Sequence, residues 1–419
     1  MILESGVKDR RLIYTSAFLR ALATGLCGVL LGLHLAARGF SLTETGRVVS
    51  AGLLGAALAA LLATLFGDRW GRRRLLMGLS MVGGLGLIAV AFAPHPWVLA
   101  AAFIGMVNGM GRDRGAGLIL DQAILPATAG ARDRTRTFAL YNVCQDVGHA
   151  LGGLLASVSA ILQHRFAFSE ALSLQWTLAL SGVCLLLTVL PCATLSRAVE
   201  PVAPHSLRSI PLSPRGRRFL IRVSALFALD SIAGGFLTAA LIALYFSQRF
   251  GTSEAVLGML FFAARAANAG SHLAASWLAR RIGLVNTMVF THIPSSVLLA
   301  TVAFAPNFPI AALLFLLREG LVEMDVPTRQ SYVMGVIQPE ERTWASGVTH
   351  LVRLGGWAVA PAFAGALMSG SWIAAPLLVG AALKILYDVL LYVAFRAHRP
   401  PEERELPTGE AAPLPSADA

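Results

Sequence analysis

The chain has 419 residues, of which 56% are hydrophobic and 14% are charged, and its formal net charge is +11. Soluble domains are about 45–50% apolar and about 25% charged, so this composition excludes a soluble enzyme, a soluble nucleic-acid binder and a disordered scaffold. A membrane-spanning helix needs about 20 apolar residues, and about twelve such helices would use nearly all of the hydrophobic residues. The composition therefore indicates a polytopic helical membrane protein.

Apolar stretches of spanning length follow one another along the chain. The first six lie at about 12–37, 46–66, 75–93, 97–124, 137–163 and 171–194, and the second six at about 219–246, 254–279, 284–305, 308–334, 343–369 and 372–395. We predict an all-α membrane protein with twelve transmembrane helices in two pseudo-symmetric six-helix bundles, residues 1–194 and 219–395. A polar linker, residues 195–218, joins them, and a Pro- and Glu-rich tail, residues 396–419, is expected to be disordered.

Positive charges gather in alternate loops. The N-terminal segment, the loop with Arg69 and Arg72, and the linker are rich in Arg and Lys, whereas the opposite loops hold only a few single arginines such as Arg38 and Arg165. This bias predicts that both termini are cytoplasmic, in a multi-pass protein of a bacterial-type inner (plasma) membrane. The positive charge is then a topology signal and a contact with anionic lipid, and it needs no nucleic acid.

The second half of the chain repeats the first at a shift of 208 residues. At this shift Arg72 coincides with Arg280, Gln122 with Gln330, and Gly148 with Gly356. Two parallel repeats are the architecture of secondary transporters, whose halves rock about a site near the membrane midplane. A duplicated structural membrane protein is the alternative.

The loop after the second span reads Gly67-Asp68-Arg69-Trp70-Gly71-Arg72-Arg73-Arg74. It resembles the signature loop of the major facilitator superfamily, which implies a twelve-span secondary transporter. The resemblance also implies that Asp68, Arg69, Gly71, Arg72 and Arg73 form a cytoplasmic latch against the N-terminus of the eleventh span. The alternative is that the arginines only set the topology.

The fifth span contains Gly148-His149-Ala150-Leu151-Gly152-Gly153. This stretch is similar to an element of proton-coupled antiporters, which favours efflux. Small residues at this spacing also allow ordinary close packing of helices.

Ionisable side chains inside spans are costly and mark functional positions unless they are paired. The predicted cavity-side spans hold seven arginines and seven carboxylates, so we expect most of them to pair and the cargo to carry no strong charge. Opposite charges that pair in one state and separate in another suit alternating access. The candidate charge-pair residues are Arg20, Arg112, Asp113, Arg114, Asp230, Arg265, Arg318, Asp325 and Arg353.

Two pairs of residues are candidate proton carriers. Glu319 and Glu323 are four residues apart and are expected to share a helix face, where mutual repulsion favours a proton on one of them. Asp146 and His149 are three apart on the fifth span.

Two other sets of charges are not expected to carry protons. Asp113 lies between two arginines and is expected to be a gate partner. Lys384 and Asp388 are expected to pair with each other on a peripheral helix.

The sequence has no phosphate-binding glycine loop of the ATPase type and no cluster of metal ligands, and His34, His272, His292 and His350 are scattered singly. We therefore predict no enzyme activity, no cofactor and no metal. The predicted function is proton-driven efflux of a small molecule, by a monomer whose partners are its substrate, protons and lipid. A proton-coupled uptake symporter and a non-transporting receptor are the alternatives.

Overall fold

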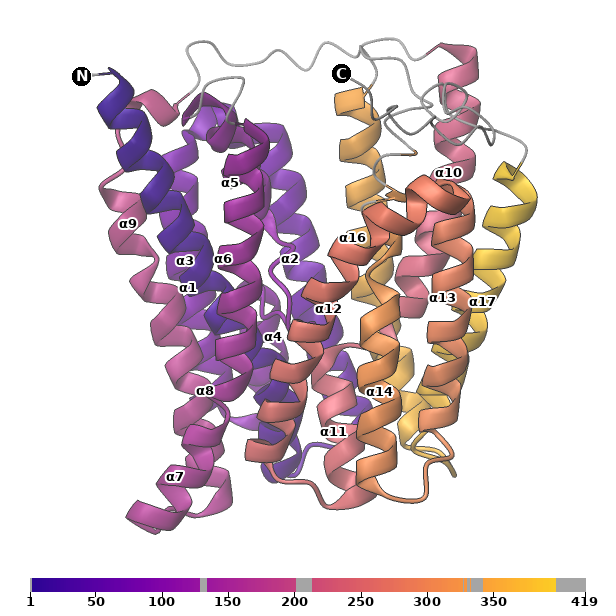
Figure 1. Ribbon diagram of the computed structural model, residues 1–419. Coiled ribbons are helices and arrows are strands. Elements are labelled where there is room, and N and C mark those ends of the chain that lie inside the picture. The colour runs from indigo at the N-terminus through magenta and orange to yellow at the C-terminus, as the bar shows by residue number, and fades with distance from the viewer. Residues whose placement is uncertain are drawn as a thin grey trace, which may run out of the picture.

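A computed structural model describes residues 2–128, 134–200, 213–326, 328–329, 332 and 342–396. In this part of the chain every regular element is a helix, and the helices form two bundles that stand side by side (Figure 1). The first bundle contains α1 Ile2–Ala37, α2 Leu42–Trp70, α3 Arg72–Phe92, α4 Val98–Ile104, α5 Ala116–Ile124, α6 Arg134–Leu154, α7 Ser157–Phe166, α8 Glu170–Leu187 and α9 Val189–Ala193. The second contains α10 Pro214–Gly235, α11 Ala239–Phe250, α12 Glu254–Ile282, α13 Leu284–Val302, α14 Phe308–Val322, α16 Arg342–Met368 and α17 Ala375–Phe395.

Helix starts follow local capping chemistry. Ser41 forms a capping box with Glu44 at the start of α2, in which each side chain bonds the backbone N–H of the other residue. At the start of α10, Ser213 accepts from Gly216 and Pro214 occupies the first turn, where a missing N–H costs nothing. Helix α10 therefore begins inside the stretch predicted as linker.

Among the described residues, 8 stretches are long and apolar enough to cross a membrane. They correspond to the predicted first, second, third, sixth, seventh, ninth, eleventh and twelfth spans. The other four predicted spans hold helices that are interrupted or that carry charges, which lowers their hydropathy. The predicted tail lies outside the described residues beyond Arg396.

The predicted fourth span is not one helix. Helix α4 ends at Ile104 and α5 begins only at Ala116. The segment between them contains Gly105, Gly109, Gly111 and Gly115, and Gly111 has a positive φ of 70°, which glycine adopts without a steric penalty. Such irregular backbone at membrane depth is tolerated where it lies inside protein or lines a cavity. We call residues 105–115 the α4–α5 break.

Two further predicted spans are also interrupted. The seventh divides into α10 and α11 at Phe236–Thr238, where the Thr238 side chain caps α11. In the tenth span, helix α14 ends at Val322, and Glu323 and Met324 form a turn. Discontinuous spanning helices commonly surround the binding site of a transporter, and the breaks in the fourth and tenth spans fall at similar places of the two repeats.

The bundles meet in the half of the molecule that lies opposite the start of α1, and they diverge toward the other half (Figure 1). In the contact between α2 and α16, a Cβ atom on Gly46 would lie 2.8 Å from the Cα atom of Gly365. A Cβ atom on Gly258 of α12 would likewise lie 2.5 Å from the carbonyl oxygen of Gly153, near the end of α6. Small residues let backbones approach in this way, so the glycines permit a tight seal between the bundles.

Candidate functional site

A cavity lies at the junction of the two bundles, next to the helix breaks. Its walls come from the α4–α5 break and from α10, α11, α12, α13, α14, α16 and α17. The charged residues that line it are Arg112, Arg114, Asp230, Arg265, Arg318, Glu319, Glu323, Asp325, Arg329, Arg353 and Lys384. We call this space the central cavity.

Three interactions join the bundles beside the cavity. Arg112 of the break forms an ion pair of 2.7 Å with Glu323, at the turn after α14. Arg265 of α12 donates to the Gly111 carbonyl at 3.0 Å, and the Ala240 N–H donates to the Gly109 carbonyl at 3.0 Å. The breaks of the two bundles are thus held together by backbone contacts and one charged pair.

Arg20 organises the interior of the first bundle. Its guanidinium bonds Asp113 at 2.9 Å, Ser16 at 2.9 Å and the buried carboxylate of Asp121. The Tyr141 hydroxyl also donates to Asp121, at 2.9 Å. Asp113, the predicted gate partner, thus pairs with Arg20 of its own bundle, because the irregular backbone turns its side chain toward α1.

His149 supports the break from α6. Its Nε2 atom accepts the backbone N–H of Asp113 at 2.8 Å, and an imidazole can accept this bond only while that nitrogen is unprotonated. The neighbouring candidate, Asp146, interacts electrostatically with Arg112 and Arg265. The geometry therefore gives His149 a role in holding the backbone and leaves Asp146 near the cavity charges.

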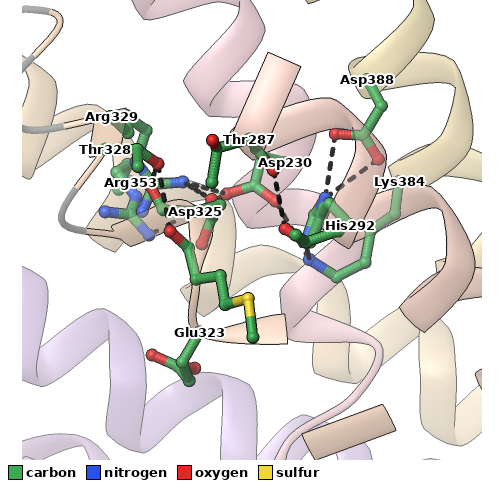
Figure 2. Close-up of polar contacts among 12 residues, drawn as sticks. Asp230, Thr287, His292, Glu323, Asp325, Thr328, Arg329, Arg353, Lys384 and Asp388 are labelled. Atoms are coloured by element: carbon green, nitrogen blue, oxygen red, sulfur yellow. Dashed lines mark hydrogen bonds and ion pairs between the residues drawn. The ribbon is translucent and has the colours of Figure 1, made fainter. Parts of the chain in front are cut away.

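Glu319 and Glu323 do not lie on one helix, because α14 ends between them. Both nevertheless line the cavity, and both interact electrostatically with Arg112 and Arg265. Glu319 contacts its neighbour Arg318 and accepts from Asn268 of α12 at 2.9 Å. Figure 2 shows the Glu323 carboxylate directed away from the other labelled charges, toward helices of the first bundle. Each glutamate therefore has a cation of its own.

The second bundle contains a buried charge network around Asp230 of α10, which we call the Asp230 network (Figure 2). Asp230 lies 3.0 Å from Lys384, 3.3 Å from Arg329 and 3.9 Å from Arg353. Arg329 also forms an ion pair of 2.6 Å with Asp325, at the one-turn spacing that supports such pairs.

The predicted pairing of Lys384 with Asp388 is wrong. Asp388 instead binds Nδ1 of His292 at 2.9 Å, and Nε2 of His292 lies 3.4 Å from the Lys384 amine. The rotation of α17 directs Lys384 toward α10 and Asp388 toward α13, so two residues expected to be peripheral belong to the network that borders the cavity. A single sequence holds no signal for this rotation.

The signature loop is held by contacts within the first bundle. Asp68 forms an ion pair of 2.8 Å with Arg72, and Gly71 has a φ of 89°, which glycine permits. Glu200 accepts the backbone N–H groups of Arg72 at 2.7 Å and Arg73 at 3.1 Å, as expected for an anion at a helix N-terminus.

Glu200 was not among the residues predicted from the sequence. Arg69 also borders a surface hollow beside this loop. The side chains at the start of α16, the predicted partner of the latch, lie outside the described residues.

The glycines of the fifth span serve close packing. A Cβ atom on Gly148 would lie 2.8 Å from the Cβ atom of Ala21, and Gly152 is packed against the backbone of Leu22. These contacts join α6 to α1, so the packing interpretation of this motif is confirmed.

Two bundles that meet around a charged cavity, with interrupted helices at membrane depth, define the architecture of a polytopic membrane transporter. The family profile described as Major Facilitator Superfamily matches residues 13–317 and again 223–417. The chain therefore belongs to the major facilitator superfamily.

The chain is similar to several curated proteins. It is 25% identical over 421 residues to the uncharacterized membrane protein YJR124C of Saccharomyces cerevisiae, covering 93% of this chain and 94% of that protein. It is 25% identical over 273 residues to the enterobactin exporter EntS of Escherichia coli O1:K1, covering 60% of this chain and 59% of the exporter.

Solved structures share the fold. The nucleoside transporter NupG superposes with a TM-score of 0.68 at 16% identity, covering 92% of this chain and 98% of that one. A bacterial homolog of the human lysosomal transporter Spinster, in an inward-facing and occupied conformation, superposes with a TM-score of 0.71 at 13% identity, covering 93% and 96%. At these identities the likeness concerns the fold alone.

Proposed function

We propose that this protein is a secondary active transporter that exports a small molecule across the plasma membrane in exchange for protons. The observation that carries the proposal is the central cavity at the junction of the bundles, crossed by the pair of Arg112 and Glu323. The protein works as a monomer without a bound cofactor, and both termini face the cytoplasm. With that orientation, the bundles are closed toward the outside and apart toward the cytoplasm.

Glu323 is the proposed proton carrier. Its carboxylate is the acidic partner in the ion pair that joins the bundles, so a proton on it removes the charge and weakens the link. Two of the three interactions between the bundles then remain, the hydrogen bond from Arg265 to the Gly111 carbonyl and the backbone hydrogen bond from Ala240 to Gly109. Protonation therefore biases the equilibrium between the two states of the transporter.

Glu319, Asp146 and His149 are the other proposed members of the coupling site. Glu319 has a cation and an amide partner within its own bundle, so its protonation leaves the link between the bundles intact. His149 would lose its bond from Asp113 on protonation at Nε2, which would loosen the break. For these reasons we propose Glu323 as the first candidate for the proton carrier.

The signature loop is the proposed cytoplasmic latch. Asp68 pairs with Arg72 while the bundles are apart on that side, and closure would bring the loop to the start of α16. Asp68 would then exchange a side-chain partner for the N-terminus of a helix, where an anion is stabilised. The arginines of the loop also contact anionic lipid headgroups.

The proposed direction is supported by the name of one relative, an enterobactin exporter, and by the resemblance of the fifth span to antiporters. Uptake by proton symport and binding without transport are the competing outcomes.

The test is a reconstitution of purified protein in proteoliposomes under an imposed pH gradient, with a panel of labelled compounds. We expect substrate-dependent proton movement that is lost in Glu323→Gln and reduced in Asp68→Asn. The matched control is Glu170→Gln, which removes an exposed carboxylate at the start of α8. Movement of a compound without protons would contradict the coupling, and binding without any movement would contradict transport.

A further inference from the structure

The central cavity has an excess of positive charge. Among the described residues that line it, seven carry a fixed positive charge and four carry a carboxylate, which leaves +3. Most charges of the predicted cavity-side spans are paired, as expected. The cavity lining itself is not balanced, because Asp113 and Asp121 pair with Arg20 in the first bundle, Asp146 is not among the lining residues, and Lys384 adds a cation. An unbalanced charge in a low-dielectric interior is costly unless a counter-ion is present.

The four carboxylates are already engaged. Glu323 is bound by Arg112, Glu319 by Arg318, and Asp325 by Arg329. The fourth, Asp230, has Lys384 and Arg329 closer to it than Arg353, whose nearest nitrogen is 3.9 Å away.

Arg114 and Arg265 form no ion pair with a carboxylate of the described residues. Carboxylates such as Asp146 and Glu323 act on these two arginines only electrostatically. Together with the more distant Arg353, Arg114 and Arg265 are the cavity arginines that have no close ion-pair partner among the described residues.

Two of these arginines converge on one aromatic ring. The guanidinium carbons of Arg114 and Arg353 each lie 4.6 Å from the centre of the Trp357 ring. Arg114 comes from the α4–α5 break of the first bundle and Arg353 from α16 of the second, and the two repel each other. The Nε atom of Arg353 is buried and has no hydrogen-bond partner among the described residues.

We propose that the central cavity binds a small polyanion, whose carboxylate or phosphate oxygens contact Arg114, Arg353 and Arg265. This assignment rests on the proposed transport function and names its substrate class. Guanidinium groups match such oxygens with two parallel hydrogen bonds, and the indole between them suits a ligand with an apolar part.

The polyanion also explains how the substrate drives the conformational change. An empty cavity holds like charges from the two bundles close together, and this repulsion favours the state with the bundles apart. A bound anion attracts both bundles at once, so it draws them together around itself. A substrate can shift a conformational equilibrium only through such a difference in affinity between the states.

The test is binding to the purified full chain, measured by isothermal titration calorimetry at low ionic strength. Citrate and fructose 1,6-bisphosphate are the carboxylate and phosphate probes, and triethyl citrate and fructose are their uncharged counterparts. We expect at least one anion to bind and its uncharged counterpart not to bind. Arg114→Gln and Arg353→Gln should each weaken the binding of the anion by roughly 10- to 100-fold, which is the effect of removing a charged hydrogen-bond donor.

Two further variants separate charge from structure. Arg353→Lys keeps the charge and should bind more tightly than Arg353→Gln. Arg165→Gln removes an exposed arginine of α7, far from the cavity walls, and should bind as the wild type does. If Arg353→Gln does not fold, Arg265→Gln gives the same comparison on α12.

Equal binding of the anions and their uncharged counterparts, or no binding of either anion to folded wild-type protein, would overturn the assignment. Proteoliposomes separate this failure from failure of the transport proposal. Coupled movement of an uncharged or cationic compound would leave the transporter proposal standing and contradict the polyanion. Tight binding of an anion that never crosses the membrane would support the polyanion and contradict transport.

Discussion

The ion pair of Arg112 and Glu323 should set the balance between the two conformations. Its atoms are 2.7 Å apart, and its side chains are 19% and 11% exposed, so solvent screens it little. A charged hydrogen bond of this kind contributes about 1.5–3 kcal/mol. Because about 1.4 kcal/mol is a tenfold change in an equilibrium constant, Glu323→Gln should reduce the population of the observed state relative to its alternative by roughly 10- to 150-fold.

Double electron–electron resonance measures this balance. Spin labels at Trp70, which ends α2, and at Ile282, which ends α12, lie on the face where the bundles diverge, and both positions are exposed. We expect Glu323→Gln and Arg112→Gln each to increase the short-distance population, and the double variant to add little to either. A distance distribution unchanged by both single variants, or additive effects of the two, would refute the role of the pair.

Three further variants test the packing and the buried networks. Gly46→Leu should prevent the bundles from closing on the side where α2 meets α16, because even a Cβ atom at this position would lie 2.8 Å from the Cα atom of Gly365. Cysteines introduced on that side should become more reactive, and unchanged reactivity would contradict the seal. Arg20→Gln leaves two buried carboxylates without their cation and should destabilise the fold by about 3–5 kcal/mol, read as a lower melting temperature. Lys384→Met should also lower the melting temperature, and a second substitution, Asp230→Asn, should restore part of the lost stability. A double variant that is less stable than Lys384→Met would contradict the pairing of Lys384 with Asp230.

The sequence was a good guide to features that depend on composition and short spacings. Hydropathy and the repeat predicted a membrane protein of two helical halves, and the signature loop predicted the superfamily. These features are local, so neighbouring residues alone determine them.

Side-chain partners across helices could not be predicted in the same way. Lys384 and Asp388 have the spacing of a pair, yet the rotation of α17 gives each a partner on a different helix. Glu200 lies in a segment without a span and acquires its role only when it meets the start of α3. Such contacts depend on helix rotation and on chain segments far apart, which a single sequence does not specify.

The helix breaks could be predicted from the sequence only in part. The glycines from Gly105 to Gly115 are a signal of irregular backbone, and the apolar stretches on either side of them hid it. The break determines which charges of the fourth span reach the cavity, and a prediction of one continuous helix could not show this.

The most direct test of coupled export uses everted membrane vesicles, whose lumen corresponds to the outside of the cell. We predict that a substrate accumulates in the lumen against its gradient when the lumen is acidified. The accumulation should collapse on addition of a protonophore and should be absent in vesicles with Glu323→Gln. Accumulation only with the opposite pH gradient, or equilibration without accumulation, would contradict proton-driven export.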